Sequence, residues 1–296
     1  WETVTTTNVG IDYEFANRRA RGSLDVYQKV TTDLFLLQPI SAINATTALN
    51  VNGGELKNTG VDLAIAYDVI RSTSEGGFNA TINFVGNYNK NEIVEFGSGE
   101  EEIIGTGRVG GKVFEYYDYR YAGVNSENGN LQFLTADGEI TETPDPDTDR
   151  VWLDKNIFPD FEGSAGLNFD YGGFFLSTQF NYTFGVDRYD FEQSSFQNIN
   201  NLGQFRLSRD LFDSWTPENT GGSLPSLDAT NQQFSGTRYL TNADFVRLRF
   251  AQFGYNLPSK YLEGTSISAL RLYLNGENLI TFSDWRGFDA EAHSNT

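Results

Sequence analysis

A glycine spacing that could bind a dinucleotide occurs in the stretch Gly105-Thr106-Gly107-Arg108-Val109-Gly110. Such a loop holds a pyrophosphate only where a helix begins directly after it, because the amide groups of the helix N-terminus contact the phosphates. The residues that follow, from Lys112 to Tyr117, are typical of a strand or a loop. We therefore expect no nucleotide site in this stretch.

Acidic residues alternate at Asp145, Asp147 and Asp149, which is the opening spacing of a calcium-binding loop. An EF-hand also needs glycine at its sixth position and a bidentate glutamate at its twelfth, where this chain has Arg150 and Asn156. The pattern excludes an EF-hand and leaves two alternatives, a looser calcium site and a solvated acidic loop. No other cofactor is expected.

Residues that could form a catalytic centre are either rare in the sequence or not set at a defined distance from one another. The single histidine, His293, lies near the chain end, and the sequence has no cysteine. A Ser-His-Asp triad, a histidine-rich metal site, a disulfide framework and a thiolate metal site therefore have no support. Carboxylates are numerous, but nothing sets two of them at the separation that a glycosidase needs. We expect a protein that is not an enzyme.

Aromatic residues in the long loops give the clearest binding signal. Their flat apolar faces and polar edges can stack on sugars, and they can equally bind peptides or partner proteins. The alternative is that they pack the loops against one another. The substrate-facing candidates are Tyr116, Tyr117, Tyr119, Tyr121, Trp152, Trp215 and Trp285.

The elements that position these loops are strands in which apolar and polar residues alternate. Val61, Leu63 and Ile65 point one way, for example, whereas Asp62 and Asp68 point the other. Eight strands are predicted, near residues 3–15, 21–36, 59–69, 77–95, 163–171, 174–186, 243–256 and 268–282. In a barrel, the polar residues of the fourth strand would face the lumen; these candidates are Asn79, Thr81, Asn83, Asn87 and Asn89.

Short and long connections alternate along the chain. The long ones span 37–58, 96–162 and 187–242, so in an antiparallel sheet they all leave from the same end. The short links include the hairpin signal Gly172-Gly173 and carry basic residues, whereas the long loops hold most of the acidic surplus. Outer-membrane barrels have short periplasmic turns and long extracellular loops. The sequence therefore predicts an all-β fold, an antiparallel transmembrane β-barrel segment with long extracellular loops.

The charge of the chain argues against one class of partner, nucleic acids. The chain has 21 basic and 40 acidic residues, a net charge of −19, and no basic stripe, so a nucleic-acid partner is not expected. No apolar run approaches the roughly 20 residues of a membrane helix.

Two local features of the strands add to the barrel prediction. Side-chain parity changes between Phe250 and Phe253, which predicts a bulge near Ala251-Gln252. Six aromatic residues near strand ends are expected in girdles at the membrane interfaces, namely Tyr67, Tyr88, Tyr171, Tyr182, Tyr255 and Phe282.

A series of short stretches, in order along nearly the whole chain, resembles the C-terminal barrel of SusC/RagA-type TonB-dependent outer-membrane transporters. These stretches are Asn8–Asp12, Gly22–Lys29, Thr31–Leu34, Gly54–Leu63, Tyr119–Val124, Glu127–Gly129, Trp215–Asn219, Phe245–Arg249, Gly254–Pro258, Asn275–Leu279 and Gly287–Asp289. Each match is modest, but the shared order makes the set specific.

The resemblance implies a 22-stranded barrel in the bacterial outer membrane, surrounded by outer-membrane lipid. It further implies an importer of glycans or peptides that works with a SusD-like surface lipoprotein and is driven by TonB. Residues 1–296 would then be a partial barrel domain of about eight strands, with the plug domain and the TonB box outside this chain. Two alternatives from the residues alone stay open: a complete eight-stranded barrel for adhesion or structure, and a secreted β-sandwich binding module.

Overall fold

The chain divides into two compact units. The computed structural model describes residues 1–41, 43, 47–74, 76–97, 99–204, 206–234 and 236–292. Unit 1 comprises Trp1–Glu100, Pro159–Gly185 and Asp244–Ser283. Unit 2 comprises Glu101–Phe158, Val186–Ala243 and Asp284–Thr296. Among the described residues, no helix is long and apolar enough to cross a membrane.

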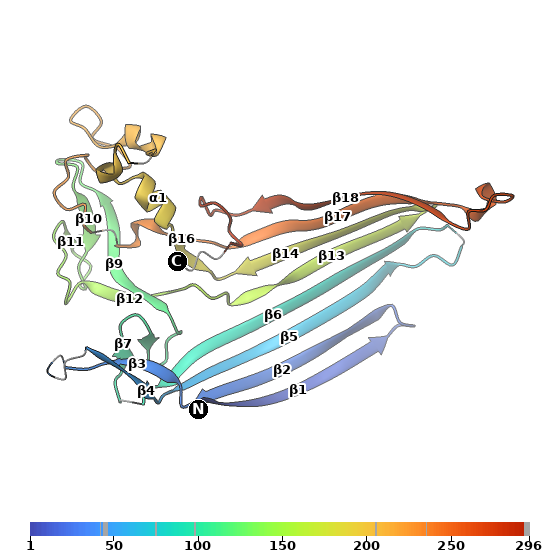
Figure 1. Cartoon of the computed structure of the whole chain (residues 1–296), viewed down its shortest axis with the longest axis horizontal. Helices are drawn as coiled ribbons and strands as arrows, with labels where there is room; N and C mark the ends of the chain where they lie inside the picture. Colours follow the sequence, from blue (N-terminus) through green and yellow to red (C-terminus); the bar gives the residue numbers. More distant parts are fainter. Residues whose placement is uncertain are drawn as a thin grey trace. The chain divides into compact units, whose positions relative to one another are not determined.

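Unit 1 is built on one eight-stranded antiparallel sheet whose strands pair in chain order (Figure 1). The strands are β1 (Thr3–Phe15), β2 (Ala20–Thr32), β5 (Glu55–Ile70), β6 (Asn79–Glu95), β13 (Phe161–Tyr171), β14 (Phe174–Phe184), β17 (Phe245–Leu257) and β18 (Leu270–Phe282). Each predicted strand is confirmed, with ends that differ by a few residues. The first long connection adds a hairpin of β3 (Phe35–Pro39) and β4 (Ala48–Asn52).

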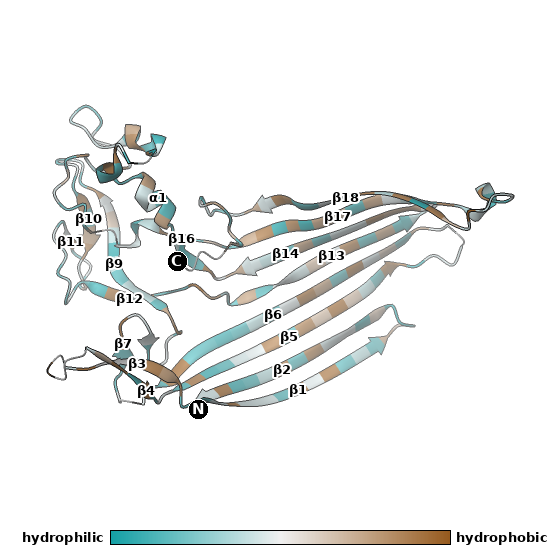
Figure 2. Cartoon of the chain, in the orientation of Figure 1, coloured by the Kyte–Doolittle hydropathy of each residue, from teal (hydrophilic) through white to brown (hydrophobic). Residues whose placement is uncertain are grey.

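The register gives this sheet one polar and one apolar face. Asp62 pairs with Asp25 on β2 and with Asn87 on β6, so polar residues stand beside one another from strand to strand. The neighbouring Val61 pairs with Val26 in the same way on the other face. Figure 2 shows the alternation as bands along the strands. Large apolar side chains on the apolar face are exposed in the chain, including Val9 at 69% and Leu274 at 78%. This face needs an apolar environment.

Aromatic side chains cover glycines on neighbouring strands. The Tyr182 ring lies over Gly163, its direct cross-strand partner, and its hydroxyl donates to the Val85 carbonyl at 2.8 Å. A Cβ at Gly163 would lie 2.0 Å from that carbonyl oxygen. The same arrangement recurs in three directly paired sets, Tyr13 with Gly22, Tyr27 with Gly60 and Phe175 with Gly254. These pairs fix strand register, because each ring fits only opposite a residue without a side chain.

A bulge interrupts β17, as predicted, but at Arg249 rather than near Ala251-Gln252. The register with β14 and with β18 shifts between Leu248 and Phe250. Arg249 Nη1 donates to Asn278 Oδ1 at 2.7 Å, and Asn278 has a positive φ of 52°. The extra residue restores one apolar face on either side of the bulge.

Aromatic rings form two clusters near the short-turn end of the sheet. Phe78 stacks on Phe169 at 6.0 Å between ring centroids and contacts Tyr171 edge-on. Phe174 lies 4.6 Å from Tyr255. Tyr171 and Tyr255, two of the expected girdle residues, thus each belong to one of these clusters.

Unit 2 has its own sheet and its own small core, so the long connections contain strands that the sequence did not predict. Tyr119 packs on the fully buried Leu131 and Phe133, and Tyr121 and Phe234 cover this cluster. β10 and β11 have only four and two residues, too few for an alternating pattern to reveal them. The sheet orders its strands as β11 (Ile140–Thr141), β10 (Leu131–Leu134), β9 (Glu115–Val124) and β12 (Arg150–Asn156).

Smaller elements complete unit 2. They are β7 (Glu102–Ile103), β8 (Gly107–Arg108), β15 (Asp187–Tyr189), α1 (Phe191–Phe196), η2 (Ile199–Asn201), η3 (Arg209–Asp213), η4 (Gly236–Tyr239) and β16 (Leu240–Asn242). Unit 1 also contains η5 (Ser259–Tyr261), in the turn between β17 and β18.

We predict that Gly163→Ala destabilises the barrel that contains this chain by about 1–3 kcal/mol, the usual cost of overpacking. The added methyl would meet both the Val85 carbonyl and the Tyr182 ring. Gly166→Ala on the same strand is the control, because its nearest neighbour would be 3.2 Å away. The measurement is the urea midpoint for loss of the compact, heat-modifiable form in detergent. Equal midpoints for the two variants would contradict the proposed role of the aromatic–glycine pair.

Candidate substrate-binding surface

Two of the seven aromatic candidates belong to the core of unit 2. Tyr119 is 6% exposed and meets Phe133 and Phe234 edge-on. Tyr121 contacts Phe133 in the same manner. Burial raises the pKa of both phenol groups. Packing therefore accounts for these two rings.

Three further candidates lie in unit 2 outside this core. Trp215 Nε1 donates to the Ser126 carbonyl at 2.9 Å, and its ring packs against Gly129. Trp285 is half-buried and lies against Gly287. Tyr116 is half-buried as well, and burial raises the pKa of its hydroxyl.

Tyr117 and Trp152 form a half-exposed pair across β9 and β12. Their ring centroids are 4.9 Å apart, and Trp152 Nε1 donates to Glu102 Oε2 at 2.7 Å. Of the seven candidates, this pair combines an aromatic face, a polar edge and a neighbouring carboxylate.

The alternating aspartates bind backbone amides. Asp149 accepts from the amides of Asp145 at 2.8 Å and Ala136 at 3.1 Å, and Asp145 Oδ1 accepts from the Asp147 amide at 2.9 Å. Within the described part of the chain, no group of three His, Cys, Asp or Glu residues is placed to hold a metal. Calcium binding by this loop stays a prediction. His293 lies outside the described residues.

The glycine-rich stretch at 105–110 forms part of a small hairpin. Gly107–Arg108 is β8 and pairs with β7, and the chain continues through a turn into β9. Arg108 binds the buried Glu115 carboxylate through Nε and Nη2, at 3.2 and 3.1 Å. No helix follows the glycines, so the geometry of a dinucleotide loop is absent from these described residues.

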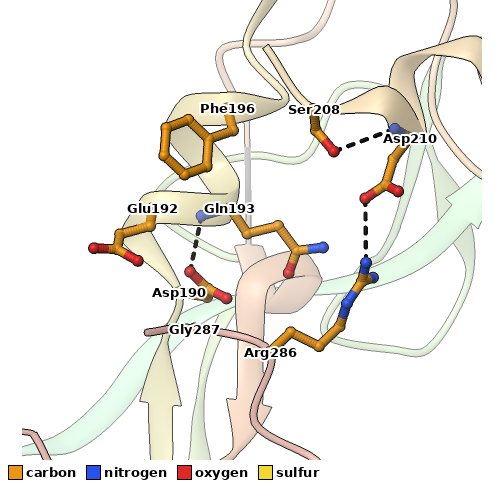
Figure 3. A pocket seen from close by; sticks show the side chains of 8 residues that line it. All are labelled: Asp190, Glu192, Gln193, Phe196, Ser208, Asp210, Arg286 and Gly287. Carbon is orange, nitrogen blue, oxygen red and sulfur yellow. Dashed lines mark hydrogen bonds and ion pairs between the residues drawn. The ribbon is translucent and has the colours of Figure 1, made fainter. Parts of the chain in front are cut away.

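A polar pocket of about 150 Å³ lies within unit 2, and sequence reasoning missed it (Figure 3). Three segments supply its walls: α1 with its N-cap, η3 with its N-cap, and the segment after β18. The lining residues are Asp190, Glu192, Gln193, Phe196, Ser208, Asp210, Arg286 and Gly287. Because positions 190 to 287 contribute without a local motif, nothing in the one-dimensional pattern could have grouped them.

Hydrogen bonds hold the polar groups of this pocket in place. Asp190 caps α1 by accepting from the Gln193 amide at 2.8 Å. Asp210 Oδ2 accepts from Arg286 Nη2 at 3.3 Å and from Gln197 Nε2 at 3.0 Å. The lining holds three carboxylates and one guanidinium, so the pocket is negative, and Phe196, 45% exposed, adds a flat apolar wall. Such a mixture suits a polar ligand with an apolar face or a positive charge.

The five polar candidates on β6 share one face of the sheet, and Asn79, Thr81, Asn87 and Asn89 bond to neighbouring strands or turns. Thr81 donates to Asp68 at 3.1 Å, and Asn87 donates to Asp62 at 2.5 Å. The remaining contacts are Asn89 to Asn58, Asn87 to Tyr27, and Asn79 with Ser72 and Gly77, whereas Asn83 stands opposite Ala66 and Gly166. The candidates therefore lie on the polar face of the sheet, which is interrupted at Val85 between Asn83 and Asn87.

Comparison with known proteins gives this architecture a family context. The family described as TonB dependent receptor-like, beta-barrel matches residues 1–113. TonB-dependent receptor P3 of Formosa agariphila is 27% identical over 317 residues, covering 99% of this chain and 31% of the receptor. TonB-dependent receptor SusC of Bacteroides thetaiotaomicron is 26% identical, covering 99% of this chain and 30% of SusC.

Comparison with solved structures leads to the same group of proteins as comparison of sequences. The RagAB peptide importer in its open-open state superposes with a TM-score of 0.86 at 27% identity, over 99% of this chain and 32% of the importer chain. This chain resembles the C-terminal barrel of the SusC/RagA-type TonB-dependent receptors. It spans about a third of the length of the relatives it matches.

This likeness confirms the predicted fold class and location: the sheet is an antiparallel barrel segment of the outer membrane. The apolar face of unit 1 is then the face toward lipid, which explains its exposed Val, Leu and aromatic side chains. The relatives are named as receptors and importers, and none of those compared above is named as an enzyme.

A carboxylate in unit 2 is held by three asparagine side chains. Glu142 accepts from Asn125 at 2.5 Å, Asn128 at 2.9 Å and Asn130 at 2.7 Å. Burial alone would raise the pKa of this carboxyl, but the three hydrogen bonds outweigh burial and lower its pKa below the ordinary value. A lowered pKa contributes stability above the unfolded value of about 4.3, and that stability is lost as the pH falls through the folded pKa.

We therefore predict that hydrogen exchange in residues 125–142 accelerates as the pH falls below about 4.3, after correction for the intrinsic exchange rate. Glu142→Gln should raise exchange already at neutral pH and remove the acid-dependent step, since an amide replaces two acceptor oxygens with one. Glu139→Gln, at an exposed neighbouring position, is the matched control. An unchanged acid step in Glu142→Gln would show that another group controls these loops.

Proposed function

We propose that this chain forms part of a TonB-dependent outer-membrane importer of glycans or peptides that works with a SusD-like surface lipoprotein. The observation that carries the proposal is the match of 99% of the chain to about a third of an importer, with a TM-score of 0.86. The amphipathic sheet supports it independently, because such a sheet has one face for lipid and one for a polar lumen.

In this function the two units have different tasks. The polar face of unit 1, with Asn79, Thr81, Asn83, Asn87 and Asn89, would line the lumen or contact a plug. Unit 2, built mainly from the long connections, would meet the substrate or the lipoprotein outside the cell. Tyr117 with Trp152 and the pocket beside Phe196 are the contact points that we favour, because both combine a ring with fixed polar groups. Energy would come from TonB acting on the plug, and no catalytic step is required.

The whole protein is tested in two ways. First, the intact mass of the polypeptide extracted from outer membranes should be several-fold above 33.1 kDa. A mass near 33.1 kDa would favour the alternative of a small eight-stranded barrel used for adhesion or structure.

Second, uptake of labelled oligosaccharides or peptides should stop when either the gene for this protein or TonB is disrupted. Uptake that persists without TonB would overturn the proposed energy coupling.

We predict that Phe196→Ala raises the half-saturating substrate concentration for uptake by about 5- to 30-fold, the effect of losing about 1–2 kcal/mol of contact energy. The ring is half-exposed, so its removal should leave the fold intact. Phe212→Ala is the matched control, because Phe212 is 91% exposed, lies in the same unit and is not among the pocket residues. Equal uptake curves for the two variants would exclude the pocket as a substrate contact.

A further inference from the structure

An apolar groove of about 490 Å³ lies on the lipid-facing side of unit 1, beside the short turns. Its lining is entirely apolar or aromatic: Tyr13, Phe15, Ala20, Ile65, Tyr67 and Ile82. One cross-strand row explains its shape, because Phe15, Ala20, Tyr67 and Ile82 stand opposite one another on four neighbouring strands. Ala20 is the small member of that row and forms the floor between two aromatic walls.

Ala20 is only 6% exposed, so the side chains around it cover the floor of the groove. The Tyr13 ring lies over Gly22, and its hydroxyl is 3.4 Å from the Ala64 carbonyl. Phe15 at 60% and Tyr67 at 39% keep exposed faces. The groove between these two exposed side chains follows from the register, which sets them on either side of Ala20.

Basic groups stand where this groove meets the turns. Arg18 pairs with Glu14 at 2.9 Å and Arg21 pairs with Asp68 at 3.2 Å, so these two arginines are largely neutralised. Arg19 has no acidic partner within 4.0 Å among the described residues, and Arg71 Nη1 donates to the Asn17 carbonyl. Four arginines thus share the carboxylates of Glu14 and Asp68, and Asp68 lies within electrostatic reach of both Arg21 and Arg71.

We propose that this groove holds one acyl chain of an anionic glycerophospholipid, whose phosphate meets the Arg19 and Arg71 side chains. Short turns of outer-membrane barrels face the periplasm, so the lipid comes from the inner leaflet. Charge complementarity selects the anionic headgroup, since each arginine near such a surface favours it. An ordinary boundary lipid would contact the same face without preference for its headgroup. The proposal concerns lipid alone and does not depend on which substrate is imported.

The test uses the full-length protein in detergent and native mass spectrometry. Phosphatidylglycerol and phosphatidylethanolamine with identical acyl chains are added in equal amounts. We expect phosphatidylglycerol to stay bound at collision energies that remove phosphatidylethanolamine. Removing each arginine, in Arg19→Gln and Arg71→Gln, should weaken phosphatidylglycerol retention by about 5-fold. Lys260→Gln, which removes one charge from another short turn, is the control and should leave retention unchanged.

A second variant tests the groove itself. Ala20→Phe fills the floor and should lower phosphatidylglycerol retention to the level of phosphatidylethanolamine. Val26→Phe adds the same ring on the same strand and face, outside the groove, and should have no such effect. Heat-modifiability on gels checks that each variant has folded. Equal retention of the two lipids by the unmodified protein, or no change in both arginine variants, would overturn the proposal.

Discussion

Backbone pairing is the constraint on which the rest of this structure depends. Inside a bilayer no water can satisfy a free amide or carbonyl, so a chain that crosses as strands must pair each one with neighbours. The central strands β5 and β6, of 16 and 17 residues, meet this demand over a long ladder. Because side chains alternate with a period of two, that ladder also separates a lipid face from a polar face. A slip of one residue would exchange them.

Register must therefore be held by something stronger than general apolarity, since many alternative registers also bury apolar groups. The aromatic–glycine pairs supply this selection. Tyr182 fits over Gly163 because glycine has no side chain; a Cβ there would collide with both the backbone and the ring. Tyr13 and Gly22 are related in the same way. The same register sets the exposed side chains of Phe15 and Tyr67 on either side of the buried Ala20, where the apolar face has a groove.

The same physics decides what could be predicted from the sequence. Strands of unit 1 were predictable because alternation is a local signal that the bilayer enforces, and even the bulge at Arg249 left a parity change within a few residues. Unit 2 carries no such signal. Its core depends on Asn231, which bonds the backbone of Leu131 from 100 positions away. The pocket beside Phe196 likewise draws on distant segments, so aromatic content alone could not separate core rings such as Tyr119 from binding rings.

Unit 2 is held together by other interactions than unit 1, mainly by side-chain hydrogen bonds. Few of its described side chains are fully buried, and polar contacts such as the asparagine side chains around Glu142 replace a large apolar core. Polar networks hold loops in defined positions while leaving their surfaces hydrated. Loops of this kind can present fixed carboxylates and rings to a solute in water. The two units are thus ordered by different interactions: glycines opposite aromatic rings fix the register of the sheet in unit 1, whereas side-chain hydrogen bonds hold the loops of unit 2.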